Sequence, residues 1–217
     1  MKKTLLYLCL FLCSFCFICC VDVVQHVTRK SDGTEKNIIS FTFSKAMFEM
    51  AKAMGGDSSS FDYNDFLDEF GDSDSLEYDG FSAKLTKIDN DFSVGYLFDM
   101  SIDYKDKNIQ EKLLTDAEIA PLPIPRYEKN KMVIYLGFLN EKNSASSNNE
   151  EMGMAFLASA VYRLLVSKKC MPQISRIVLK SATQNMNIGY ADFYDEYLIE
   201  VPIPLLVAEK CRIELYK

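Results

Sequence analysis

The first twenty residues place the strongest constraint on this chain, because they do not have the character of a folded domain. Lys2 and Lys3 precede a nearly continuous apolar run at residues 5–18, which ends in Cys19 and Cys20. A basic start followed by a short apolar core is typical of an export signal. We therefore expect residues 1–19 to be a signal peptide and residues 20–217 to form a single globular domain.

The end of this run resembles the signal of a bacterial lipoprotein. In that family a peptidase cleaves before a cysteine that carries lipid, and Phe17-Ile18-Cys19 before Cys20 is similar to the relaxed form of the cleavage motif. The resemblance covers residues 1–20 only. It implies that Cys20 is the lipid attachment site, where palmitate would be incorporated. It also implies an exported protein, lipid-anchored to a bacterial membrane at the periplasmic face or the cell surface.

Two alternatives for the same segment remain open. An uncleaved membrane anchor needs about 20 apolar residues, and the stretch at residues 5–24 is interrupted by Ser14 and Asp22. An ordinary secretory signal would end in a small-x-small cleavage site, which this segment lacks. Each alternative also directs the chain out of the cytosol, so a cytosolic location is not expected.

The net charge of −7 comes from one segment of the chain. Residues 57–79 hold nine acidic side chains and no basic one, whereas acidic and basic residues balance in the rest of the mature chain. We expect residues 57–80 to be a loop-rich, solvent-facing excursion. Asp72-Ser73-Asp74-Ser75 resembles the start of a calcium loop, but Glu77 stands where that loop needs glycine, so no metal site is expected. We find no basic stripe, which argues against nucleic acid as a partner.

Only two cysteines, Cys170 and Cys211, lie outside the first twenty residues. An even pair of cysteines in an exported protein is consistent with a disulfide bond. Two separate buried thiols are the alternative. The sequence leaves both open, because the distance between the two residues is not known from it.

The body of the chain is predicted to be an α+β domain with a largely antiparallel sheet. Asp32-Gly33 between two β-rich runs predicts a first hairpin that begins directly after Cys20, without a flexible tether. The clearest predicted helix is the mostly apolar stretch at residues 150–169, packed in the core and flanked by Glu150 and Lys169. The other predicted elements are a helix at 44–54, a short acidic helix at 61–70, and strands at 21–28, 37–43, 81–88, 92–104, 132–139, 174–182, 186–193, 197–203 and 211–216.

The residue types that carry common catalytic chemistry are sparse. His26 is the one histidine, and a lone histidine in a strand is more often structural than catalytic. We expect no catalytic residues, no metal ligands and no cofactor. The predicted function is a non-enzymatic binding or assembly module of the cell envelope, with the membrane and an envelope protein or lipid as partners. A lipoprotein that handles hydrophobic ligands and a carboxylate-dependent hydrolase remain as alternatives.

Overall fold

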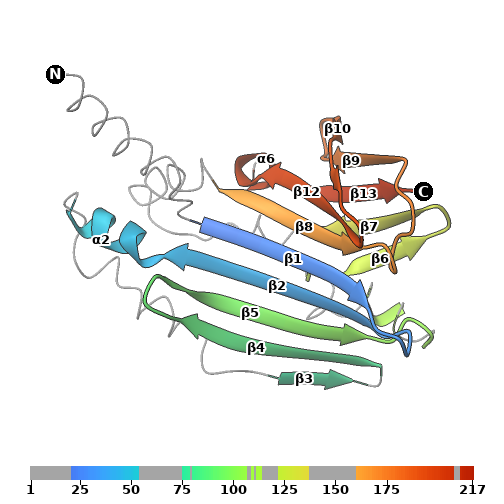
Figure 1. Cartoon of the computed structure of the whole chain (residues 1–217), viewed down its shortest axis with the longest axis horizontal. Helices are drawn as coiled ribbons and strands as arrows, with labels where there is room; N and C mark the ends of the chain where they lie inside the picture. The colour runs from blue at the N-terminus through green and yellow to red at the C-terminus, as the bar shows by residue number, and fades with distance from the viewer. Residues whose placement is uncertain are drawn as a thin grey trace.

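The computed structural model of the chain describes residues 21–53, 75–78, 80–106, 109, 111–113, 122–136, 160–207 and 211–217. These residues form two β-sheets, which we call the large sheet and the small sheet, with short helices beside them (Figure 1). Cys20, residues 57–74 of the acidic segment and residues 150–159 of the predicted long helix lie outside the described residues.

The large sheet has eight strands in the order β11-β12-β8-β1-β2-β5-β4-β3. Its strands are β1 (Val21–Arg29), β2 (Glu35–Ser44), β3 (Ser75–Tyr78), β4 (Phe81–Asp89), β5 (Ser93–Ile102), β8 (Val161–Ser167), β11 (Ala191–Asp192) and β12 (Glu196–Pro202). Helix α2 (Lys45–Ala53) follows β2, and α6 (Ile203–Val207) follows β12. None of the helices in the described ranges is long and apolar enough to cross a membrane.

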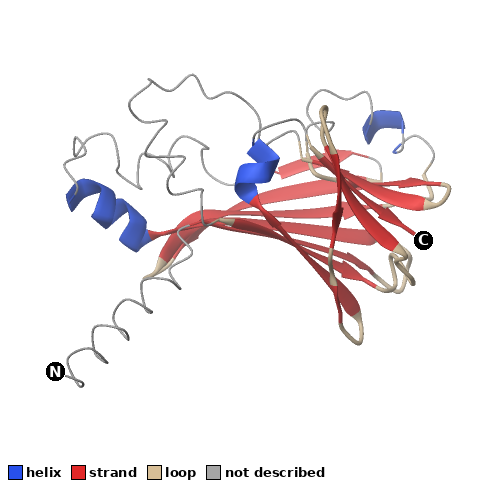
Figure 2. Ribbon diagram, turned by 90° about the horizontal axis from the view of Figure 1, so that it is seen from above, coloured by secondary structure: helices blue, strands red, loops and turns tan. Residues whose placement is uncertain are grey.

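The small sheet has five strands in the order β10-β9-β13-β7-β6. Its strands are β6 (Pro125–Glu128), β7 (Lys131–Tyr135), β9 (Arg176–Lys180), β10 (Asn185–Ile188) and β13 (Arg212–Tyr216). It packs against the half of the large sheet that contains β1, β8 and β12 (Figure 2).

The main core lies between the two sheets. Alternate residues of β1 and β8 face inward, as the strand period of two requires, and Val23, Tyr162 and Leu164 are fully buried there. They meet inward-facing residues of the small sheet such as Ile213 and Leu215. A second apolar cluster fills the other half of the large sheet; its buried members are Ile39, Phe81, Met100, Ile102, Ile109, Leu113 and Ile124.

Strand β1 joins the two halves of the large sheet. It pairs antiparallel with β2 along its whole length and parallel with β8 from Asp22 to Val27. The other strand pairings in the described residues are antiparallel. The predicted first hairpin is confirmed, and Gly33 has a φ of 93° in its turn, a conformation that glycine adopts without steric cost.

The predicted fold class is wrong: the structure is mostly β-sheet, and the α+β domain with one long packed helix does not fit it. The clearest error is the helix at residues 150–169, because Val161–Ser167 forms strand β8. Strand β8 alternates between buried Tyr162, Leu164 and Val166 and partly exposed Val161, Arg163 and Leu165, and two of these outward residues are also apolar. Such a run satisfies a helical pattern as well as a strand pattern, and β-branched Val161 and Val166 were the signal for a strand.

The strands predicted at 81–88 and 92–104 are confirmed as the paired β4 and β5, and the strand at the edge beside them was missed. Ser75–Tyr78, inside the predicted acidic loop, forms β3 and pairs with β4. The acidic segment therefore begins to join the large sheet before residue 80. Leu76 of β3 and Ala83 of β4 pack against the second apolar cluster, and Phe81 of β4 is one of its buried members.

We expect Gly95→Ala to destabilise the fold strongly. A Cβ atom at Gly95 in β5 would lie 2.0 Å from the backbone oxygen of Phe41 in β2, and a backbone atom cannot move aside without breaking the ladder. The free energy of unfolding, measured by urea denaturation, should fall by about 3 kcal/mol. The control is Gly189→Ala, which has open space around it and should change stability by less than about 0.5 kcal/mol. Equal effects of the two substitutions would contradict the β2–β5 packing.

Candidate functional site

The structure separates the residues that the sequence singled out. The predicted lipid attachment site, Cys20, lies outside the described residues, immediately before Val21 of β1. His26 points to the outer face of the large sheet, where its Nε2 atom lies 3.3 Å from a carboxylate oxygen of Glu196. A half-exposed histidine beside one carboxylate has the arrangement of a surface pair rather than of a catalytic triad.

Cys170 and Cys211 are both buried, and neither forms a disulfide bond in the structure. Cys170 follows the C-terminal end of β8, whereas the Cys211 thiol lies 3.4 Å from the carbonyl oxygen of Leu205 in α6. Helix α6 is tied to the other end of β8, because the Ile203 amide donates to the Ala160 carbonyl. A seven-residue strand spans about 20 Å, and a disulfide needs Cα atoms within about 7 Å. The considered disulfide between them therefore does not fit this fold.

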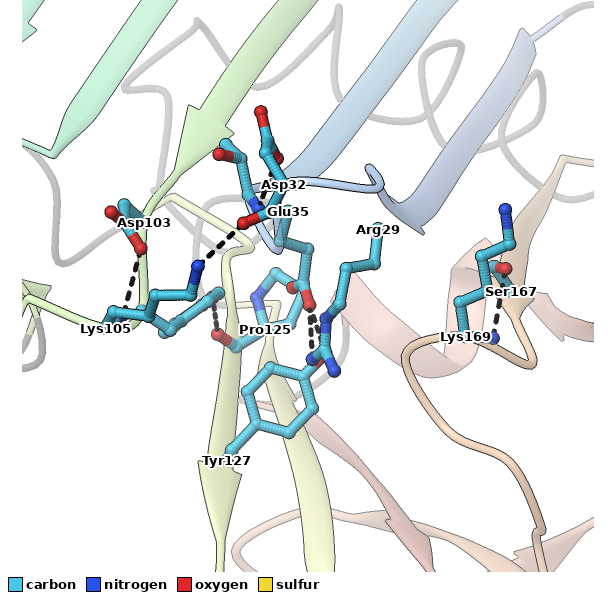
Figure 3. A network of polar contacts seen from close by, with 11 residues as sticks. Arg29, Asp32, Glu35, Asp103, Lys105, Pro125, Tyr127, Ser167 and Lys169 are labelled. Carbon is cyan, nitrogen blue, oxygen red and sulfur yellow. Dashed lines mark hydrogen bonds and ion pairs between the residues drawn. The ribbon is translucent and has the colours of Figure 1, made fainter.

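A polar cluster closes one end of the space between the sheets (Figure 3). Arg29 and Tyr127 converge on Glu35, whose side chain is fully buried: the guanidinium donates at 3.3 Å, and the phenol donates to the same oxygen. Burial raises the pKa of Glu35, and its contacts with Tyr127 and Arg29 offset this in part. Burial also raises the pKa of the nearby Cys170 thiol to about 12, and the Glu35 charge adds to that effect. A thiol of this kind stays protonated and is a poor nucleophile.

A second polar group is sealed in the core. Gln25 donates to the Asn37 side chain at 2.8 Å and to the Pro123 carbonyl at 2.7 Å, and it accepts from Tyr162. Asn37 also donates to Pro123 at 3.3 Å. These contacts tie β1, β2 and β8 to the proline-containing segment before β6. Buried polar groups are costly unless they are paired, so we interpret this network as a structural one.

The described residues hold no group of three or more histidine, cysteine, aspartate or glutamate side chains placed to bind a metal ion. The strongest candidate for function lies elsewhere, on the outer face of the small sheet. We call it the basic face, and its members come from β6, β7, β9 and β13. They are Arg126, Lys131, Tyr135, Arg176, Lys180, Arg212 and Tyr216, with Glu214 at the centre.

The antiparallel register brings these residues into rows. Tyr216 of β13 is paired with Arg176 on one side and Lys131 on the other. Arg212 is paired with Lys180 and Tyr135 in the same way. Outward positions recur every second residue in a strand, so four short strands build one continuous surface of cations and tyrosines.

Each tyrosine ring of the basic face lies between two cations. The Arg176 guanidinium is 4.3 Å from the centre of the Tyr216 ring, and the Lys131 ammonium is 5.8 Å from it. The Arg126 and Arg212 guanidinium groups are 4.6 Å and 6.0 Å from the centre of the Tyr135 ring. Such cation–π contacts hold the charged groups in place while leaving their outer edges able to donate hydrogen bonds.

Glu214 organises the centre of the basic face. One oxygen lies 3.1 Å from Lys131 and 2.9 Å from Arg212, and the other lies 2.9 Å from Lys180 and accepts from the Tyr216 hydroxyl. Burial opposes ionisation of this carboxylate, but the bonds from Tyr216 and the three cations outweigh it and lower its pKa to about 2. Glu214 is therefore charged at neutral pH and holds three cations on one side of the sheet.

The basic face has a surplus of positive charge although the whole chain is acidic. Its five cationic side chains face only two carboxylates, Glu214 and the exposed Glu128, which leaves a net charge of +3. Planar guanidinium groups and ammonium groups arranged in this way recognise phosphate, sulfate or carboxylate groups. This surface was not predicted from the sequence, because each strand contributes only one or two basic residues. The signal was an arginine, lysine or tyrosine at the first and the last residue of each of the segments 131–135, 176–180 and 212–216, which lie on one face of a strand.

No protein-family model matches the chain, and no curated protein or solved structure matches it with significance. The assignment of function below therefore depends on the sequence and on the geometry of the described residues.

We expect Glu214→Gln to make the free energy of unfolding less sensitive to acid. The ordinary pKa of a glutamate is near 4.5 and that of native Glu214 is about 2. Its stabilising effect is thus present above pH ~4.5 and is lost as the pH falls towards ~2, because the unfolded chain binds the proton first. Between these values the wild type should lose about 2 kcal/mol more of its unfolding free energy than the variant. Urea denaturation over this pH range measures the difference.

The matched control is Glu128→Gln, which removes the same charge from a half-exposed partner of Lys131. Surface pairs contribute little to stability, so this variant should keep the pH dependence of the wild type. A Glu214→Gln protein with an unchanged acid transition would show that the central carboxylate is not held as described.

Proposed function

We propose that this protein is a lipid-anchored, non-enzymatic binding module of a bacterial envelope and that it holds an anionic partner on the basic face. The observation that carries the proposal is the placement of Tyr135 and Tyr216, each between two cations, around the fixed charge of Glu214. Side chains that are positioned before binding lose less conformational freedom when a ligand arrives. Charge complementarity on such a surface also speeds the encounter with an anionic partner.

The start of β1 supports the anchored location. Val21, the residue after Cys20, is already buried and paired with Phe43 of β2. A lipid on Cys20 would therefore be attached directly to the central strand of the large sheet, without a linker between the membrane and the fold. The basic face would then be held at a short distance from the membrane, where envelope polymers and proteins that carry anionic groups are accessible.

The polar clusters support binding rather than catalysis. Glu35 is covered by Arg29 and Tyr127, and the protonated Cys170 thiol beside it lacks the reactivity of a nucleophile. On the basic face, Glu214 is saturated by four donors and cannot act as a general base at neutral pH, because its pKa is about 2.

We expect radiolabelled palmitate to enter the wild-type protein in a bacterial host and to be absent from Cys20→Ser. The thioether to the lipid forms on the cysteine that becomes the first residue after cleavage, so serine at this position cannot accept it. The matched control is Cys19→Ser, which keeps a small residue before the cut and should remain labelled. Continued labelling of Cys20→Ser, or loss of label from Cys19→Ser alone, would contradict the assignment of Cys20.

We expect Arg176→Glu to weaken binding to immobilised dextran sulfate about tenfold, which corresponds to about 1.4 kcal/mol. Arg176 is exposed on β9 and contacts the Tyr216 ring, so the reversal places a negative charge inside the basic face. The matched control is Lys84→Glu, an equal charge change at an exposed position of β4 in the large sheet. It should bind almost as the wild type does. Salt should weaken wild-type binding, because the attraction is screened.

Equal weakening by Arg176→Glu and Lys84→Glu would show that only the net charge matters, and would overturn the assignment of the basic face. Retention of wild-type protein that does not respond to salt would do the same. Circular dichroism of both variants checks that the β-sheet is intact in each of them.

A further inference from the structure

We propose that the end of the large sheet at which β1 begins rests on the lipid bilayer, with Phe92 and Leu205 as apolar contacts on either side of the lipid. This inference rests on the proposed attachment of lipid to Cys20. It goes further by assigning a membrane-contacting surface to the folded domain itself. We call this surface the anchored end, and it consists of the start of β1, the β4–β5 turn at residues 90–92, and α6.

The strand register places the β4–β5 turn beside the start of β1. Val21 is paired with Phe43 of β2, and Phe43 is paired with Val94 at the start of β5. Two strand spacings separate Val21 from Val94, which is about 10 Å. Phe92 lies two residues before Val94, about 7 Å further along, so the turn lies within roughly 15 Å of the residue that follows Cys20, and in Figure 1 both are at the same end of the large sheet.

The β4–β5 turn is held rigidly and still exposes Phe92. The Asn90 side chain accepts from the backbone amides of Phe92 and Ser93 at 2.9 Å each, and the Phe92 carbonyl accepts from the Lys45 amide at 2.8 Å. The Phe92 side chain is nevertheless 81% exposed. These bonds fix the backbone of the turn, and in the structure the Phe92 ring extends from it into solvent.

Leu205 occupies the other side of the start of β1. The Ile203 amide donates to the Ala160 carbonyl, which places α6 at the beginning of β8, the parallel neighbour of β1. Leu205 in this helix is 37% exposed. Its neighbours Ile203 and Leu206 face the core, so α6 presents Leu205 outward from the same end of the sheet.

Single exposed apolar residues are common on proteins and do not by themselves indicate a partner. Phe92 and Leu205 differ from such residues by their position at the anchored end. A lipid joined directly to β1 brings the anchored end to the level of the lipid headgroups, and aromatic and aliphatic side chains there gain free energy by entering the boundary with the acyl chains. The other exposed aromatic side chains among the described residues, Tyr190, Phe193 and Tyr194, belong to the opposite end, where the Lys168 amide donates to the Asp195 carbonyl.

The chain contains no tryptophan, so one introduced tryptophan reports on a single position. The experiment uses the full-length, lipidated protein reconstituted in phosphatidylcholine vesicles, in two variants. Phe92→Trp places the reporter at the anchored end. Tyr194→Trp is the matched control, because Tyr194 is 93% exposed at the opposite end. Emission wavelength and quenching by a lipid with a nitroxide near the headgroup are measured, and vesicle flotation shows whether the protein is attached.

The proposal expects the emission of Phe92→Trp to shift to shorter wavelength on vesicles and to be quenched by the nitroxide lipid, while Tyr194→Trp keeps the emission of the protein without vesicles. If the protein floats with the vesicles but the emission of Phe92→Trp neither shifts nor is quenched, the membrane contact is wrong and the lipid anchor is unaffected. Protein that carries no palmitate and does not float would overturn the anchor and, with it, this inference. Equal quenching of both variants would also contradict it, since the protein would then lie on its side.

Discussion

The hydrogen bonding of β1 on both of its edges is the constraint on which the rest of the structure depends. Nine residue pairs join it to β2 and six join it to β8. The first hairpin and strands β8, β11 and β12 thereby become one sheet. Its inward residues Val23 and Val27 are fully buried between the two sheets. Gln25, on the same face, connects β1 with Asn37, Tyr162 and Pro123.

Because β1 is central, its first residues determine how a lipid on Cys20 would hold the domain. A tether between a lipid and a domain would let the domain turn freely above the membrane. Here the residue after Cys20 is the first residue of β1, so the proposed lipid would fix the end of the sheet that faces the bilayer. The basic face, on the outer side of the small sheet, would be held near the membrane.

The hairpins could be predicted from the sequence because their signals are local. Asp32-Gly33 and the alternation around it determine the first turn, and Asn90 does the same for the second through bonds to residues two and three positions later. The strand at 161–167 could not be distinguished from a helix in this way. Its outward residues Val161 and Leu165 are apolar like its buried ones, which obscures the alternation, and its partners β1 and β12 are remote in sequence. A periodic pattern alone does not contain that information.

The candidate site was missed for a related reason. Arg176, Arg212 and Lys131 are separated by long stretches of sequence and become neighbours only through the pairing of β9, β13 and β7. Each of these residues by itself resembles an ordinary solvent-exposed position of a strand. The same holds for Glu214, whose three cationic partners come from three different strands.

The central claim is that β1 is paired with β8 as well as with β2. NMR spectroscopy of the mature domain tests it most directly, through nuclear Overhauser contacts between the backbones of residues 23–27 and 162–166 together with the secondary chemical shifts of 161–167. The structure predicts strand-type shifts and contacts in the parallel register that pairs Val24 with Arg163 and His26 with Leu165. Helical shifts at 161–167, or the absence of contacts between the two segments, would contradict it.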